Sequence, residues 1–485
     1  MLSQTAVFTK LVQDYMGPPP VVVSESATCG EVVRRMRDLR ANSVLVVDRD
    51  SRPVGIVTEQ DVCRRITFQG PPDQLATDVM TAPLRWVRAD DYLYHAIAEM
   101  RRCALRHMPV VDREHRAVGI LQQHDALAVA AARMVEQIEL LTHSRTLAGM
   151  HKTKAAQVEV ATQLFADRAP APEVQTLITS INNDLYRRIV DLCMRDMKHD
   201  GYGDGPLRFD VVVMGSGGRG ESYLYPDQDN GFIIEDYPDA DHQQVDAWFI
   251  ELATRMSDAL NEVGFPYCNG FVMATNPLWR KSISQWREQT TRWVSKGSGM
   301  VLRLADIFFD FTCVHGEGAL TSQLREHVTV TARKPFFLRE MYKLDAEHEV
   351  ALGPFNRLLT DKLEGPNKGK LNLKLTGTLP LVGATRIAAL AHGIPATSTR
   401  ARIDALHQQG VLTNDEQDYL KGAFRHITNL LLRQQLRDYQ AEQKVGNHVS
   451  LEDLSKRERD ILIVSLKAIK EFRRRLRTEL TGDLF

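Results

Sequence analysis

The sequence predicts a multidomain α/β protein whose last third is entirely helical. Three observations support this fold class. Residues 18–130 repeat a strand–helix–strand–strand–helix pattern, two short apolar strands flank a glycine-rich turn within residues 209–236, and helical periodicity dominates beyond about residue 335. A chain of 485 residues is long enough for about three domains, each with its own core.

Composition narrows the class of protein. The chain has 61 Lys and Arg against 62 Asp and Glu, a formal net charge of -1, so nothing in its overall charge favours a nucleic acid or a membrane surface. Its 6 cysteines are scattered, without the spacing of a zinc site or the density of a disulfide scaffold. No apolar run approaches membrane-spanning length. We therefore expect a soluble cytoplasmic protein without a nucleic-acid or membrane partner.

The N-terminal repeat is predicted element by element. Its first copy places strands at 21–23, 43–47 and 54–57, and helices at 29–39 and from 59 onward. Its second copy places strands at 84–87, 108–111 and 117–121, and helices at 93–103 and from 124 onward. The tags Val-Val-Asp at 46–48 and 110–112, and Gly-Ile at 55–56 and 119–120, align the copies.

This repeat resembles a pair of CBS domains, which we expect at 18–75 and 76–132. The resemblance implies clefts for AMP, ADP or ATP, in which a hydroxyl residue and an aspartate after the Gly-Ile strand contact phosphate and ribose. The first copy keeps both, as Thr58 and Asp61, whereas the second keeps Asp125 but carries Gln122 at the hydroxyl position. Alternatively, Thr58 caps a helix and Asp61 occupies its first turn. Because CBS pairs commonly associate face to face, a homodimer is expected.

A helical connector is expected at 133–173, within a helical region that includes apolar faces at 128–146 and 174–197. Two interpretations remain open. The connector could serve packing and dimer contact, or it could be a lever by which occupancy of the CBS pair biases the following domain.

The central stretch combines a phosphate-sized loop with two acids. A β-branched strand at 209–214 runs into Gly215, Ser216, Gly217 and Gly218, and a second strand follows at 231–234. Between them lie Asp227 and Asp229, which strand periodicity places on one face. A nucleoside triphosphate needs a carboxylate-bound divalent metal and donors for its phosphates. Glycine N–H groups, the Ser216 hydroxyl and the Arg219 fork are such donors.

A Gly-Ser turn followed by Asp-x-Asp resembles the signature of polymerase-beta-like nucleotidyltransferases. The fuller forms GSGGRGE at 215–221 and DQDN at 227–230 resemble the branch near the uridylyltransferase that modifies the PII signalling protein. The resemblance implies transfer of a nucleoside monophosphate from ATP or UTP to an acceptor hydroxyl, for example on a signalling protein, with release of pyrophosphate. Mg²⁺ or Mn²⁺ would be held by Asp227 and Asp229, and the phosphates by Gly215, Ser216, Gly217 and Arg219.

Two other activities compete with this interpretation. The chain could be a non-catalytic signalling adaptor that senses adenosine nucleotides with the same fold, or a hydrolase in which water attacks the metal-bound triphosphate.

The catalytic domain is expected at 174–322, with a helix at 243–263, an extended piece at 264–274 and a strand over 306–314. The resemblance implies a third carboxylate that completes the metal site and assists deprotonation. Asp310 is the better candidate because of its apolar neighbours, and Asp306 shares its face by parity. Alternatively, Asp310 is a paired strand acid without a catalytic role. Thr312 stands where relatives favour arginine.

Two nearby charges also allow two interpretations. Arg219 is expected to bind phosphate and Glu221 to support the loop, but the two could instead form an ordinary local ion pair.

Residues 335–480 resemble the helical substrate-binding domain of the same family. Within it, Lys374 and Arg386 are candidates to lean into the active site and hold triphosphate or acceptor. Solvated helix charges are the alternative for both.

Overall fold

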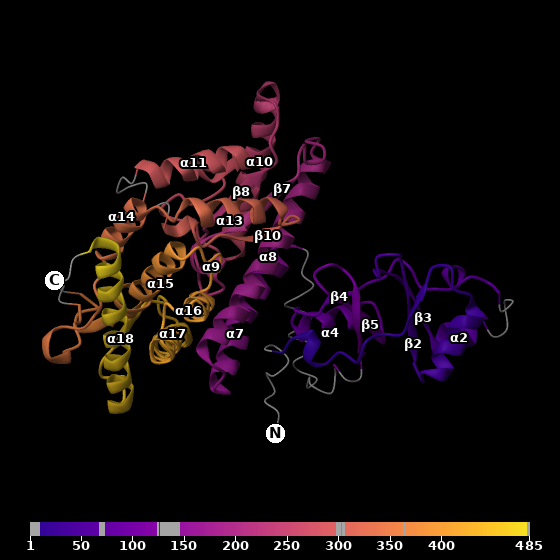
Figure 1. Ribbon diagram of the computed structural model, residues 1–485, viewed down its shortest axis with the longest axis horizontal. Coiled ribbons are helices and arrows are strands. Elements are labelled where there is room, and N and C mark those ends of the chain that lie inside the picture. Colours follow the sequence, from indigo (N-terminus) through magenta and orange to yellow (C-terminus); the bar gives the residue numbers. More distant parts are fainter. Residues whose placement is uncertain are drawn as a thin grey trace. The chain divides into compact units, whose positions relative to one another are not determined.

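The structure is a computed structural model that describes residues 10–66, 73–123, 126, 146–296, 302, 306–361 and 365–482. The chain divides into an N-terminal unit, Met1–His143, and a C-terminal unit, Ser144–Phe485. Figure 1 labels many of their elements. In the part of the chain that the structure describes, no helix combines the length and the apolar run needed to cross a membrane.

The N-terminal unit contains the predicted repeat. Its elements are η1 (Val12–Asp14), β1 (Val22–Ser24), α2 (Cys29–Asp38), β2 (Ser43–Val47), β3 (Pro53–Thr58), α3 (Glu59–Asp61), η2 (Val62–Ile66), η3 (Ala76–Asp78), β4 (Val87–Arg88), α4 (Leu93–Arg102), β5 (His107–Val111) and β6 (Ala117–Gln122). The order strand, helix, strand, strand occurs twice, which confirms the periodic pattern. The helix predicted from 124 and the site residue Asp125 lie outside the described residues.

Each copy builds a three-stranded sheet with the same topology. In β1-β2-β3 and in β4-β5-β6 the first pair is parallel and the second antiparallel. Every residue of β2 is buried, as expected for the continuous apolar run of a central strand. The side chain of Thr28 accepts from Glu31 N and thereby caps α2, whose apolar face covers the sheet.

The C-terminal unit contains a four-stranded sheet and most of the helices. Its first part comprises α7 (Leu147–Ala166), α8 (Ala171–His199), β7 (Phe209–Val213), α9 (Gly215–Arg219), β8 (Asn230–Ile234), η4 (Asp239–Asp241), α10 (His242–Val263), η5 (Pro277–Trp279), β9 (Arg280–Ser282), α11 (Ile283–Lys296), β10 (Thr312–His315) and α13 (Ala319–Thr331). The sheet order is β10-β7-β8-β9, in which only β8 and β9 pair in parallel.

The long helix α8 contacts α7, α10, α17 and β10, and Figure 1 shows it running past the edge of this sheet. It contains the helix predicted at 174–197. The other helix predicted in this region, at 128–146, lies almost wholly outside the described residues.

Two of the predicted extended segments are wrong. Residues 264–274 form no strand, and residues 306–310 form a helical turn that leads into β10, so that only the second half of the predicted 306–314 strand exists. For the 306–310 segment, the reason is the packing of Phe308, Phe309 and Phe311, which are all fully buried. A run that buries consecutive aromatic rings has no two-residue alternation, so strand parity did not apply here.

The remaining elements form the helical C-terminal region. They are α14 (Pro335–Asp345), η6 (Pro354–Asn356), β11 (Lys370–Asn372), η7 (Lys374–Thr378), α15 (Leu379–Ala391), α16 (Thr399–Gln408), α17 (Asn414–Gln440), β12 (His448–Ser450) and α18 (Lys456–Thr481). The only addition to the all-helical expectation, within the described residues, is the antiparallel pair of β11 and β12. One continuous hydrophobic cluster runs from Val212 in the sheet through Phe308 to Leu476 in α18. The sheet and the C-terminal helices therefore share a core.

Candidate active site

The glycine-rich turn after β7 is a single helical turn, α9, whose glycines are required by close approaches. Gly215 has φ +58°, and a Cβ there would lie 3.1 Å from Oδ2 of Asp229. A Cβ at Gly218 would lie 1.6 Å from the carbonyl oxygen of Asp310, which no side chain permits. Glycine therefore lets α9 lie directly against the segments that carry Asp229 and Asp310.

The two acids of the Asp-x-Asp motif lie together in the extended segment before β8. Ligand atoms of Asp227, Asp229 and Cys268 all lie within 4.8 Å of one another. Burial, and then the charge of Asp227, raise the pKa of Asp229 to about 7, against the lowering effect of the Cys268 hydrogen bond and of the Lys374 and Arg219 charges. Two carboxylates held this close repel each other, and a bound cation relieves that repulsion.

A narrow cleft joins these acids to α9. It is lined by Ser216 and Gly217, by Asp227 and Asp229, and by Asn182, Tyr186 and Phe265 among others. Its free volume is about 20 Å³, enough for one small group rather than for a whole nucleotide. The structure thus brings together the predicted Gly215–Gly217 turn and the predicted acid pair.

Sequence reasoning missed the contributions of Cys268, Asn182 and Tyr186. Cys268 belongs to no recognisable cysteine spacing in the sequence, and it is buried beside Asp229. Asn182 and Tyr186 lie on α8, before the glycine turn in the sequence, and belong to no motif. A buried polar residue in an otherwise apolar helix face was the one available signal for Asn182.

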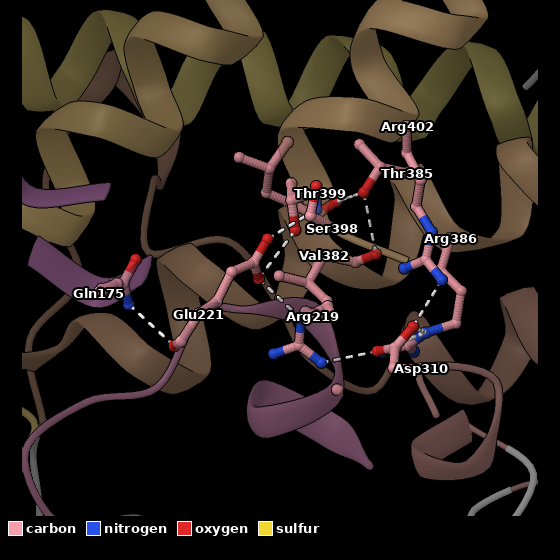
Figure 2. A network of polar contacts seen from close by, with 12 residues as sticks. Gln175, Arg219, Glu221, Asp310, Val382, Thr385, Arg386, Ser398, Thr399 and Arg402 are labelled. Atoms are coloured by element: carbon pink, nitrogen blue, oxygen red, sulfur yellow. Dashed lines mark hydrogen bonds and ion pairs between the residues drawn. The ribbon is translucent and has the colours of Figure 1, made fainter. Parts of the chain in front are cut away.

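Asp310 lies in a buried cluster of arginines. Its carboxylate accepts hydrogen bonds of 2.6 Å from Arg219 Nη1, Arg386 Nη2 and Arg402 Nη2, and Figure 2 shows the three guanidinium groups around it. Burial opposes the ionisation of Asp310, but the charges of Arg386, Arg402 and Arg219 outweigh it and hold its pKa far below the ordinary value. Asp310 is therefore a fully paired anion with 0% exposure.

This geometry corrects the prediction that Asp310 completes the metal site and accepts a proton. Both of its oxygens are occupied by guanidinium groups, and it is not among the described residues that gather at Asp227. The alternative, a paired acid, is what the structure shows. Asp306 also contacts Arg386 and is partly exposed. Thr312 donates to Gly218 O at 2.8 Å and so connects β10 to α9.

Arg219 is likewise occupied by protein carboxylates rather than open to phosphate. It is buried, and it donates to Glu221 at 2.7 Å and to Asp310 at 2.6 Å. Glu221 in turn accepts from Thr399 N at 2.6 Å and from Thr399 Oγ1 at 3.1 Å, at the start of α16 (Figure 2). The predicted phosphate role of Arg219 gives way to the local ion pair, which ties α9 to the C-terminal helices.

The two basic candidates of the C-terminal region differ. Arg386 is buried against Asp310 and so does not lie free in the cleft. Lys374 is exposed at the start of η7, and its charge acts on Asp229. Of the two, Lys374 is the exposed one, and its role as a ligand-binding residue stays a prediction.

In the N-terminal unit, Thr58 and Asp61 bind each other. Thr58 N and Oγ1 donate to Asp61 Oδ2 at 3.0 and 2.7 Å, and Asp61 N donates back to Thr58 Oγ1 at 3.4 Å. This is a capping box at the start of α3. The capping alternative is thus present, and the ligand role of these residues stays a prediction. Gln122 ends β6.

Family models match most of the chain. Residues 12–67 and 76–132 match the CBS domain. Residues 155–300 match the model described as "Putative nucleotidyltransferase DUF294", and residues 335–480 match "Putative nucleotidyltransferase substrate binding domain".

Curated relatives share shorter regions. An uncharacterized protein of Methanopyrus kandleri is 32% identical over 108 residues, which are 22% of this chain and 55% of that protein. The CBS domain-containing protein CBSCBSPB2 of Arabidopsis thaliana is 30% identical over 121 residues, which are 24% of this chain and 22% of that protein. The chain thus spans about half or less of the length of these relatives.

Among solved structures, a CBS domain protein from Pyrobaculum aerophilum complexed with AMP is 29% identical, with a TM-score of 0.23 over 24% of this chain and 89% of that one. A CBS domain pair/ACT domain protein from Thermotoga maritima is 28% identical, with a TM-score of 0.22 over 24% of this chain and 94% of that one. From the family matches, the chain carries a tandem pair of CBS domains followed by a domain of the DUF294 type and the substrate-binding domain of that family.

Proposed function

We propose that this chain is a CBS-regulated nucleotidyltransferase that moves a nucleoside monophosphate from ATP or UTP to an acceptor hydroxyl and releases pyrophosphate. One observation carries the proposal: the carboxylates of Asp227 and Asp229 lie within 4.8 Å of each other, in one cleft with Ser216 and Gly217 of α9. This site falls in the region that matches the DUF294 model.

The donor set fits a hard divalent cation. Mg²⁺ and Mn²⁺ take oxygen ligands, and Mg²⁺ commonly keeps water and substrate phosphates beside one or two carboxylates. Asp227 and Asp229 would hold the ion, since Asp310 is occupied by arginines. A bound ion would neutralise the charge that develops on the phosphates. The thiol of Cys268 is a softer donor that neither ion prefers. Burial raises its pKa to about 11, so that it stays protonated, and the expected ligands are the two carboxylates.

The residues of the cleft would then position the nucleotide. The Ser216 hydroxyl and the backbone N–H groups of Gly215 and Gly217 are the donors for the departing phosphates, and Lys374 takes the role first expected of Arg219. The acceptor oxygen forms a bond to the α-phosphorus while the bond from that phosphorus to the oxygen bridging to the β-phosphate breaks. Pyrophosphate leaves with the electron pair, and the hydroxyl proton passes to water.

The acceptor we propose is a hydroxyl on a signalling protein, by the resemblance to the PII uridylyltransferase. The test is transfer of label from α-³²P-ATP and α-³²P-UTP, with Mg²⁺ or Mn²⁺, to the proteins of a cell extract. Asp227→Asn/Asp229→Asn should abolish labelling. The matched control is Asp239→Asn/Asp241→Asn, an exposed Asp-x-Asp pair in η4, which should label as the wild type does.

A second candidate function is the nucleotide-binding adaptor. It is favoured by the withdrawal of Asp310 into the arginine cluster, which leaves two carboxylates for the metal. If nucleotide binds in an Asp227-dependent manner but no acceptor is labelled by either nucleotide, the adaptor interpretation replaces the transferase. Labelled nucleoside monophosphate released without an acceptor would instead indicate hydrolysis.

We further propose that Thr58, Asp61 and Asp125 hold AMP, ADP or ATP in the CBS pair, and that the chain is a homodimer. Adenosine-nucleotide affinity should fall in Asp61→Ala, with Thr28→Ala as the control because Thr28 caps α2 in the same copy. Light scattering that shows only monomer would contradict the dimer.

A further inference from the structure

A cluster of buried polar side chains lies behind the cleft, between α7 and α8. It consists of Lys154 and Gln157 on α7 and Asn182 on α8, with exposures of 3%, 1% and 3%. Neither catalysis nor the family signature accounts for these residues. Apolar side chains of equal size would have filled the same helix–helix contact without any cost of desolvating polar groups.

Each hydrogen bond among these three side chains has a defined donor and acceptor. Lys154 Nζ donates to Gln157 Oε1 at 2.9 Å and to Asn182 Oδ1 at 2.7 Å. A lysine that donates twice can do so with or without its third proton, so both amide oxygens must face it. Gln157 Nε2 is consequently turned away and donates to Ile178 O at 2.7 Å and to Asn182 Oδ1 at 3.0 Å.

These contacts fix the amide of Asn182. Its oxygen accepts from both Lys154 and Gln157, so a flipped amide would set an NH₂ group against two donors. The Nδ2 group must therefore point away from α7. In the part of the chain that the structure describes, this Nδ2 is buried and has no hydrogen-bond partner.

The unmatched donor belongs to the cleft. Asn182 lines it together with Ser216, Asp227 and Asp229. A buried donor without an acceptor is unfavourable, and the hydrogen bonds from Lys154 and Gln157 hold the Asn182 amide in this orientation. The free volume of about 20 Å³ admits a single small acceptor such as a phosphate oxygen, and is far too small for a base ring.

We propose that Asn182 is a nucleotide-binding residue whose amide NH₂ donates to a phosphate oxygen of the nucleoside triphosphate held at Asp227 and Asp229, with Lys154 and Gln157 as positioning residues that set its orientation. This rests on the proposed function and adds α8 as a further wall of the phosphate site. The ligand class is any metal-bound polyphosphate, with or without a nucleoside.

The experiment is calorimetric titration of the full chain with Mg²⁺ and either a non-hydrolysable α,β-methylene-ATP or inorganic tripolyphosphate. Hydrogen bonds to charged groups predict that Asn182→Ala weakens both ligands by roughly ten- to a hundredfold. Gln157→Glu should also weaken both, although it alters no residue of the cleft. A carboxylate at 157 accepts from Lys154 and from a flipped Asn182 amide, which then turns its oxygen toward the phosphate. The unfolding temperature of each variant is measured in parallel, so that a loss of affinity is not confused with a loss of folding.

The outcomes separate this inference from the proposed function. If the wild type binds in an Asp227-dependent manner and Asn182→Ala binds both ligands within twofold of it, the assignment of Asn182 is overturned while the nucleotide site stands. Loss with α,β-methylene-ATP but not with tripolyphosphate overturns the phosphate oxygen as acceptor. If the wild type binds neither ligand, the proposed function fails and this inference fails with it. Should Asn182→Ala not fold, Gln157→Glu decides.

Discussion

Replacing Asp310 with asparagine separates a structural from a catalytic role for this residue. In this cluster three guanidinium groups form ion pairs with three carboxylates. The arginines are Arg219, Arg386 and Arg402, and the acids are Asp310, Glu221 and Asp306. The Asp310→Asn variant would keep the shape of the side chain but remove the carboxylate that all three arginines share. Uncompensated charge of this kind in a buried cluster costs about 3–5 kcal/mol.

This cost can be measured by thermal or urea unfolding followed by tryptophan fluorescence, because four of the five tryptophans lie in the C-terminal unit. At about 2 °C per kcal/mol for a unit of this size, the midpoint should fall by roughly 6–10 °C. Asp227→Asn is the matched comparison. It relieves repulsion at an exposed acid and should leave the midpoint unchanged or slightly higher.

The binding of Mg²⁺ and α,β-methylene-ATP to the folded protein gives the opposite ranking. Asp310→Asn should retain metal and nucleotide binding, whereas Asp227→Asn should lose it. The reasoning is refuted if Asp310→Asn unfolds at the wild-type midpoint yet fails to bind metal, because Asp310 would then be the third metal ligand that the family resemblance implied.

Three further predictions concern other sites. Burial lowers the pKa of Lys154 to about 7, whereas the unfolded chain keeps this proton up to the ordinary value near 10.5. Wild-type stability should therefore gain roughly 2–3 kcal/mol between pH 7.5 and 9.5 relative to Lys154→Met, as measured by urea unfolding. Equal pH slopes in the two proteins would disprove a depressed pKa. Cys268→Ser should leave both Mn²⁺ and Mg²⁺ binding unchanged, because these ions prefer oxygen ligands and burial raises the pKa of the Cys268 thiol to about 11. The Mn²⁺ electron paramagnetic resonance signal, with Mg²⁺ as competitor, measures both affinities, and a severalfold loss of Mn²⁺ affinity would show that the thiol is a ligand. Thr58→Ala should cost the N-terminal unit about 1 kcal/mol through its helix cap, and a negligible change in urea unfolding would show that the capping box contributes nothing.

Local patterns were sufficient for much of this architecture. The tandem repeat was predictable because identical tags recur at a fixed period, and the strand before α9 because a β-branched run ends in a glycine-rich turn. The proximity of Asp227 and Asp229 follows from their spacing of two in an extended segment. In each case the determining residues are neighbours in the chain.

What could not be predicted depends on distant partners. Arg386 and Arg402 follow Asp310 by 76 and 92 residues, and no local pattern indicates that their side chains meet. The same holds for Cys268 beside Asp229 and for Asn182 behind the cleft. The strand prediction at 306–310 was wrong for a different reason. Burial of successive phenylalanines removes the alternation on which a strand prediction rests.

The sheet and the C-terminal helices share a hydrophobic core and an ion-pair cluster. The border near residue 330 therefore does not separate two independent domains. A fragment that ended at 322 would leave Asp310 with one arginine of three, Glu221 without Thr399, and one side of the aromatic core open to water. Neither half would then be an independent folding unit. Limited proteolysis should accordingly release the C-terminal unit as a single resistant body. Any ligand bound by the last helices would touch the same cooperative unit that carries Asp227 and Asp229.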